Sequence, residues 1–331
     1  GTVLALVILE VLLRSMGFVY YFEKRNTPGE YADEDFVVLC VGDSATFGQG
    51  VAGHPNRQSY PAQLERLLRQ RHPDFEGEFH VVNMGLPGMN SSQLARRFEG
   101  YVQLHHPDLA IVLIGNNDVW NQNETFAYIV GKGEEAEIDE KIETWLRSWS
   151  DSIRVIRLAR VIAVNLDDDR DEMYDAKGEE QRHDDHFNAM EDVWPGMDHF
   201  KDGLDILGEV EHVQALYRFN FKRIRKVAEE YDVDLLWLDY HLGAKFGETK
   251  YIEPVLEKMS ANRLDLFPLF HTQDIEKDVN RWDETVKKDL ICPDQWHPNE
   301  LGYAVFARAV YNKLVELDKV PGPPMDIWED L

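Results

Sequence analysis

The sequence predicts an α/β fold with a mainly parallel, doubly wound sheet. Four short apolar runs rich in Val, Ile or Leu predict the strands, at residues 36–41, 79–82, 109–114 and 233–238. They lack the polar alternation of a half-exposed strand, which is typical of a sheet covered on both faces. Helical patterns lie between these runs, and this alternation favours parallel strands. Ligands of such sheets bind beyond the carboxyl ends of the strands.

Each predicted helix follows or precedes one of these strands. Residues 59–72 have Ser59 as the expected N-cap, Pro61 in the first turn and leucines on one face. Three further helical patterns occupy residues 91–106, 213–231 and 299–317. The last one follows Pro298 and closes the fold.

The composition predicts a folded globular protein. Of 331 residues, 44% are apolar and 61 are acidic against 35 basic, which gives a net charge of −26. Such a surface repels phosphate backbones, so nucleic acid is not an expected partner. Cys40 and Cys292 are too few for a disulfide scaffold and lack zinc-site spacing. Two small buried residues are favoured, and a single bridge between them stays open.

The first 24 residues form a separate apolar segment. It is apolar from Thr2 to Leu13 except for Glu10, and Arg14 then interrupts it. We expect the end of a membrane anchor or an uncleaved signal segment, because about 20 apolar residues span a bilayer. An amphipathic helix packed on the domain, with Glu10 and Arg14 paired, is the alternative.

Residues 121–205 interrupt the strand-helix rhythm. They hold 23 acidic and 10 basic residues. Isoleucines and tryptophans recur at helical spacing over 138–156, which predicts a long amphipathic helix. We interpret this region as an acidic insertion within a single domain spanning residues 30–331. The run from His183 to His186 is expected to be solvated surface rather than a metal site.

The stretch Gly42-Asp43-Ser44 follows the first strand directly. A phosphate-binding loop needs a lysine that is absent here, and a G-x-S-x-G elbow is excluded by Thr46. A serine in this position could be a nucleophile, and it could equally cap the next helix.

Three other polar groups follow the strands. The second strand runs into a glycine-rich loop at 83–92. The third ends in Asn116-Asn117-Asp118, where an amide could donate to an oxyanion or close an Asx turn. Near the C-terminus, Asp294 and His297 are three residues apart, so the carboxylate could orient the imidazole of a general base. A metal pair or a surface pair are the alternatives.

In their order, these four blocks resemble the SGNH, or GDSL-type, serine hydrolase family. The blocks are Gly42-Asp43-Ser44, the loop containing Gly88, Gly115-Asn116-Asn117-Asp118 and Asp294-Gln295-Trp296-His297-Pro298. The resemblance covers residues 36–120 and about 233–316. It implies a three-layer α/β/α sandwich with a flavodoxin-like sheet. It also implies an esterase that needs neither a cofactor nor a metal ion.

The resemblance also implies roles for individual residues. Ser44 is the expected nucleophile, His297 the general base, and Asp294 the residue that orients His297. The backbone amides of Ser44 and Gly88 and the side chain of Asn117 are the expected oxyanion donors.

Residues beside these groups have less direct expected roles. Asp43 is expected to hold the turn through backbone hydrogen bonds. Trp120 is a candidate substrate-binding residue or a core residue. Trp145 and Trp149 could place the inserted helix over the crevice as a lid, and core packing is the favoured alternative.

The family acts on acetylated sugars, lipids, thioesters and aryl esters. We expect a small acyl ester, or an acylated carbohydrate or lipid, as the substrate, with acetyl as the favoured acyl group. An acyltransferase with the same triad and a non-catalytic binding protein are the alternatives. Residues 10–17 resemble the end of the anchor in membrane-attached bacterial relatives, which favours the cell envelope over the cytoplasm as the location.

Overall fold

The computed structural model describes Leu12 and residues 29–51, 55–118, 210–241, 252–272, 286–292 and 297–329. The chain divides into two units, and the unit comprising Thr27–Thr125 and Val213–Leu331 contains the sheet. The other unit, Gly1–Asn26 and Phe126–His212, lies almost wholly outside the described residues. The predicted N-terminal segment and the predicted helix at 138–156 therefore stay predictions.

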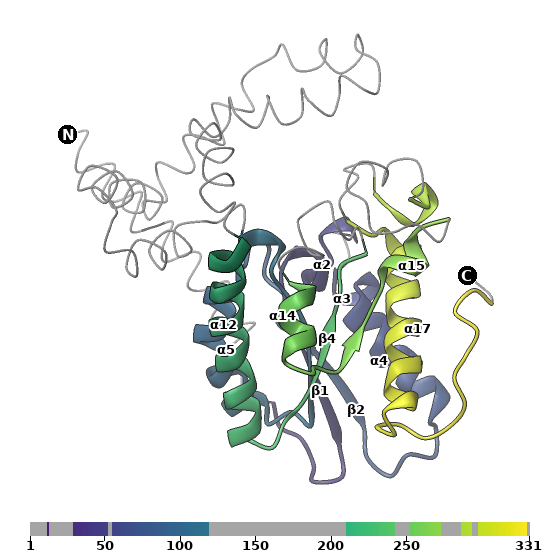
Figure 1. Ribbon diagram of the computed structural model, residues 1–331. Coiled ribbons are helices and arrows are strands. Elements are labelled where there is room, and N and C mark those ends of the chain that lie inside the picture. The colour runs from purple at the N-terminus through teal and green to yellow at the C-terminus, as the bar shows by residue number, and fades with distance from the viewer. Residues whose placement is uncertain are drawn as a thin grey trace, which may run out of the picture. The chain divides into compact units, whose positions relative to one another are not determined.

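Five parallel strands form one sheet in the order β2-β1-β3-β4-β5. The strands are β1 Phe36–Gly42, β2 Phe79–Asn83, β3 Leu109–Leu113, β4 Asp234–Leu238 and β5 Arg263–Leu264. This is the flavodoxin-like strand order. Figure 1 shows α5 and α12 on one face of the sheet and α4 and α17 on the other. The predicted three-layer fold is confirmed.

The four predicted helices are present with small shifts at their ends. They are α4 Tyr60–Arg71, α5 Ser91–His105, α12 Val210–Glu230 and α17 Glu300–Glu316. Asn90 and Gln93 form a capping box at the start of α5, and Asn299 caps α17. Ser59 occupies the N-cap position of α4, as predicted, but its hydroxyl makes no capping hydrogen bond.

The fifth strand and several short helices were not predicted. The helices are α2 Ser44–Phe47, α3 Pro55–Gln58, α14 Glu253–Lys258 and α15 Phe267–Phe270, with the 3₁₀ turns η1 Gln49–Val51, η2 Asn116–Asp118 and η5 Lys288–Leu290. Arg263 in β5 forms an ion pair with Asp239, which is fully buried beyond the end of β4. This ion pair holds β5 beside β4 at the edge of the sheet. The two residues are not part of any periodic sequence pattern, so the pair could not be predicted from the sequence.

The central strands of the sheet are buried. All five residues of β3 are buried, and so are six of the seven residues of β1. Cys40 lies in β1, and burial raises the pKa of its thiol to about 12. No disulfide joins Cys40 to the half-buried Cys292.

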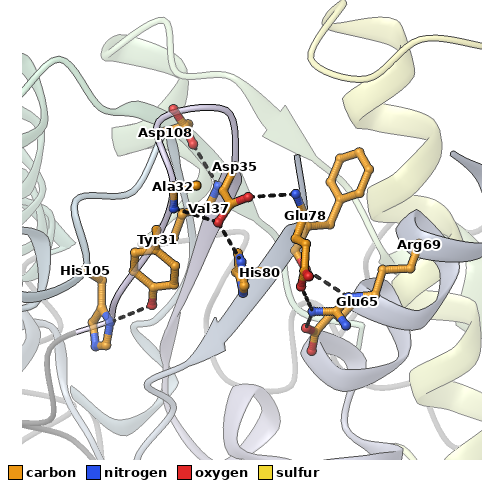
Figure 2. Close-up of polar contacts among 11 residues, drawn as sticks. Tyr31, Ala32, Asp35, Val37, Glu65, Arg69, Glu78, His80, His105 and Asp108 are labelled. Atoms are coloured by element: carbon orange, nitrogen blue, oxygen red, sulfur yellow. Dashed lines mark hydrogen bonds and ion pairs between the residues drawn. The ribbon is translucent and has the colours of Figure 1, made fainter. Parts of the chain in front are cut away.

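Polar contacts also form at the opposite edge of the sheet, where β1 and β2 begin. Asp35, just before β1, accepts hydrogen bonds from the backbone of Ala32 and Glu78 and contacts His80 (Figure 2). Beside it the Tyr31 hydroxyl lies 3.0 Å from Nδ1 of His105. These contacts attach the chain before β1 to β2 and α5. None of the helices in the described segments is long and apolar enough to cross a bilayer.

Candidate active site

The residues of the candidate site lie at the carboxyl ends of β1, β2 and β3. Since β1 pairs in parallel with both β2 and β3, the three ends meet at one edge of the sheet. Ser44 begins the helix that follows β1, Gly88 lies in the loop after β2, and Asn117 lies in η2 after β3. His297 enters from the chain just before α17.

Ser44 and His297 are brought together although 253 positions separate them in the chain. The Ser44 Oγ lies 2.9 Å from the His297 Nε2. The Cys292 backbone N–H donates to the His297 carbonyl at 2.8 Å, which holds the His297 backbone in place. Ile291 and Pro298 form an antiparallel bridge at the same place. The serine hydroxyl and the imidazole are thus within the range of a nucleophile and its base.

The turn that presents Ser44 is held by Asp43. The Asp43 side chain accepts from the Ala45 backbone N–H at 3.0 Å and caps α2. The expectation that Asp43 holds the turn is met, and it is Asp43 rather than Ser44 that caps the helix. Glycine is needed just before it, because a Cβ on Gly42 would lie 2.2 Å from the Leu113 carbonyl oxygen.

The loop after β2 continues along the end of β1. The Leu86 backbone N–H donates to the Gly42 carbonyl at 2.9 Å, which fixes the loop beside the Ser44 turn. Gly88 has φ +75°, a left-handed conformation in which L side chains are strained. This explains the glycine at the position predicted to supply an oxyanion amide.

Asn117 points toward the Ser44 turn. Its Nδ2 lies 3.1 Å from the Asp43 Oδ2 and 3.2 Å from the Met89 carbonyl oxygen. Both contacts are at the long end of the hydrogen-bond range. The Asn117 amide therefore lies between the Gly42-Asp43-Ser44 turn and the loop that contains Gly88, and it donates to an acceptor in each.

A buried network supports the loop that carries Asn117. The Asp118 carboxylate accepts from the Ser91 hydroxyl at 2.6 Å and from the Ser91 backbone N–H at 2.8 Å. Asn220 of α12 donates to the hydroxyl groups of Ser91 and Ser92. In the same way, Tyr217 of α12 donates to the Gly115 carbonyl at 2.7 Å. The sequence did not predict these contacts of Asn220 and Tyr217, because in the sequence the two residues are only part of a helical pattern.

The Asp43 carboxyl group is buried within the site. It is 2% exposed, and burial raises the pKa of this carboxyl to about 6. Hydrogen bonds from Tyr240 and from the Ala45 backbone, and the nearby His297, oppose the rise. The Tyr240 hydroxyl donates to Asp43 Oδ2 at 2.5 Å. Tyr240 was not predicted, since nothing in the sequence beyond β4 sets it apart.

Two predicted site residues, Asp294 and Trp120, lie outside the described residues, as does the run from His183 to His186. Their roles stay predictions. Within the described segments, no group of three or more His, Cys, Asp or Glu side chains is arranged to hold a metal ion.

Comparison with known structures gives several distant likenesses. A family 3 carbohydrate esterase from Clostridium thermocellum is 14% identical, with 86% of this chain and 98% of that chain covered and a TM-score of 0.43. An acetyl xylan esterase from Geobacillus stearothermophilus is 16% identical, with 86% and 95% covered and a TM-score of 0.43. A lipase/acylhydrolase from Enterococcus faecalis is 12% identical, with 88% and 99% covered and a TM-score of 0.42.

At this level of similarity, no conclusion on substrate follows from these structures. No curated protein sequence matches the chain. The model of the GDSL-like lipase/acylhydrolase family matches residues 40–194, a range that includes the first three sequence blocks. Residues 40–194 therefore form a GDSL-like lipase/acylhydrolase domain.

Proposed function

We propose that the protein hydrolyses acyl esters, with acetyl as the favoured acyl group, on a carbohydrate or lipid, and that Ser44, His297 and Asp294 form its catalytic triad. The observation that carries this proposal is the 2.9 Å contact between Ser44 Oγ and His297 Nε2. The acetyl group, the carbohydrate or lipid acceptor and the cell-envelope location are supported by the resemblance of the sequence blocks alone.

The first half of the reaction forms an acyl-enzyme. Ser44 Oγ attacks the ester carbonyl carbon while His297 Nε2 takes the hydroxyl proton, and the tetrahedral oxyanion forms. When the oxyanion collapses, the ester C–O bond breaks and His297 returns the proton to the leaving alkoxide. Asp294 is assigned the orientation of His297 and the stabilisation of its cation.

The second half releases the acid. Water attacks the carbonyl carbon of the acyl group on Ser44 while His297 takes a proton from the water. When this second tetrahedral intermediate collapses, the bond between the acyl carbon and Ser44 Oγ breaks and His297 returns the proton to Oγ. The backbone amides of Ser44 and Gly88 and the Asn117 side chain are assigned to the oxyanion in both halves. Asn117 exchanges one of its two long contacts for the oxyanion when the acyl group is bound.

Hydrolysis of p-nitrophenyl esters by the purified protein tests the proposal. We expect acetyl and butyryl esters to be cleaved faster than long-chain esters, and an organophosphonate to inactivate the wild type but not Ser44→Ala. If the wild type neither reacts with the phosphonate nor cleaves any ester of the series, the proposal is wrong.

An acetylated polysaccharide then separates hydrolysis from transfer. A hydrolase releases one free acetate for each acetyl group lost, even when an unacetylated sugar acceptor is present. Acetyl groups that instead appear on the added sugar would assign the protein to the acyltransferases that use the same triad.

A further inference from the structure

We propose that Tyr240 is a positioning residue of this site, which holds the Asp43 carboxylate against the Asn117 amide and so fixes both the nucleophile turn and the third oxyanion donor. The inference rests on the proposed function, because it gives Tyr240 a role in the reaction assigned to Ser44. It adds a residue that none of the four sequence blocks contains.

The geometry links three neighbouring strands. Tyr240 lies two residues beyond the end of β4, and β4 is separated from β1 by β3 alone. The Tyr240 hydroxyl nevertheless reaches Asp43, just beyond β1, at 2.5 Å. The same oxygen, Oδ2, accepts from Asn117 of η2 at 3.1 Å. One carboxylate oxygen therefore joins groups that follow β1, β3 and β4.

The other carboxylate oxygen acts on the nucleophile. Asp43 Oδ1 accepts from the backbone N–H of Ala45, so the side chain of the residue before Ser44 holds the residue after it. A shift of Asp43 would therefore move the Ser44 turn and the Asn117 amide together. Tyr240 is itself 3% exposed, so its ring has little freedom to follow such a shift.

The short contact from Tyr240 also leaves Asn117 available. A buried carboxylate oxygen without a donor is costly, and Tyr240 remains a donor to Oδ2 if the Asn117 amide turns to the oxyanion. The Asn117 contacts at 3.1 and 3.2 Å are longer than the Tyr240 contact, so they are the ones that give way. This arrangement is suited to a donor that binds an oxyanion only during the reaction.

Charge adds a pH dependence to this arrangement. Among the described residues, three titratable side chains interact with the Asp43 carboxylate: Tyr240 beyond β4, His297 before α17 and Tyr60 of α4. The Tyr240 hydrogen bond lowers the pKa of the Asp43 carboxyl against the larger effect of burial. Removing the hydroxyl therefore favours the protonated carboxylic acid, which no longer offers Asn117 the same acceptor.

The test compares the wild type, Tyr240→Phe and a matched control, Tyr311→Phe. Tyr311 is equally buried but lies on α17, where its ring packs against His72. Rates with p-nitrophenyl acetate are measured from pH 5.5 to 9 and divided by the amount of enzyme that a phosphonate titrates, so that only folded protein is counted. The variants Asn117→Ala and Asn117→Ala/Tyr240→Phe complete a double-mutant cycle.

We expect Tyr240→Phe to lower kcat about 10-fold while KM stays within about twofold, as for a misplaced catalytic group. We also expect the acid limb of its pH profile to move to higher pH. The double variant should be slower than Asn117→Ala, but by less than the loss seen in Tyr240→Phe alone, because Tyr240 acts partly through Asn117. Tyr311→Phe keeps the wild-type rate and profile.

Three results would overturn the inference while the wild type remains active: an unchanged kcat in Tyr240→Phe, an unshifted acid limb, or rate losses that multiply in the double variant. A wild type that neither titrates with phosphonate nor cleaves the ester would instead remove the proposed function itself. The two failures are thus distinguishable.

Discussion

The Ser44 Oγ lies 2.9 Å from the Nε2 of His297, although one residue begins the helix after the first strand and the other precedes the last helix. Their approach depends on the parallel sheet, which places Ser44 at the edge where the carboxyl ends of the strands meet, and on the hydrogen bond from Cys292 that holds the His297 backbone. The contact is direct, so proton transfer from the hydroxyl to the imidazole needs no intervening water.

Replacing Asp294 by Asn tests the assignment of the third triad residue. The change keeps the shape of the side chain but favours the wrong tautomer of His297, so we expect kcat for p-nitrophenyl acetate to fall about 10⁴-fold. The control is Asp289→Asn in η5, which leaves kcat unchanged. Equal activity of Asp294→Asn and the wild type would show that another group orients His297.

Replacing Asn117 by Ala removes one proposed oxyanion donor. We expect kcat to fall about 10²- to 10³-fold with little change in KM, because the oxyanion exists only in the transition state and intermediate. Steady-state kinetics on p-nitrophenyl acetate measure both constants. A rise in KM with an unchanged kcat would assign Asn117 to substrate binding instead.

Replacing Asn220 by Ala tests the network beneath the third block. Asn220 is 1% exposed and donates to two serine hydroxyl groups, so its loss should lower the free energy of unfolding by about 1–3 kcal/mol. Lys226→Ala, at an exposed position of the same helix, should change it by at most about 0.5 kcal/mol. Urea denaturation of the two variants checks the difference, and equal midpoints would contradict the role of the network.

The Asp43 carboxyl gives folding stability a pH dependence of unusual sign for a carboxyl group. Its pKa is about 6 in the folded protein against 3.8 as a reference, so the native state binds this proton more tightly than the unfolded chain. The stabilisation is fully present below pH 3.8 and is lost as the pH rises through 6, by about 3 kcal/mol in all.

Asp43→Asn isolates this effect, because it removes the titrating group and leaves the others. We expect the unfolding free energy of the wild type minus that of the variant to fall between pH 4.5 and pH 7.5. Denaturant titrations of both proteins at both pH values measure how the gap between their unfolding free energies changes with pH. A value independent of pH would mean that the carboxyl does not titrate in this range.

Much of the fold could be predicted because it is set by apolar pattern. The strands at Phe36–Gly42 and Leu109–Leu113 are buried on both faces, and such runs stand out in a sequence. The fifth strand could not be predicted, because Arg263–Leu264 is two residues long and its place depends on pairing with β4 and on the ion pair to Asp239.

The candidate site divides in the same way. The positions of Ser44, Asn117 and His297 followed from the order of the sequence blocks, because the ends of parallel strands meet at one edge of the sheet. The contacts of Tyr240 and Asn220 could not be predicted, since side chains that reach across strand ends follow no period. Asp294, Trp120 and the acidic insertion at 121–205 lie outside the described residues, and their roles stay predictions.

The central claim, that Ser44 is a nucleophile activated by His297, is tested most directly by the rate at which a fluorophosphonate reacts with the wild type and with His297→Ala. Mass spectrometry of the digested protein identifies the modified peptide. We expect the label on Ser44 in the wild type, and a rate at least about 10³-fold lower in His297→Ala, because the hydroxyl is a weak nucleophile without its base. A label on another residue, or equal rates in the two proteins, would contradict the claim.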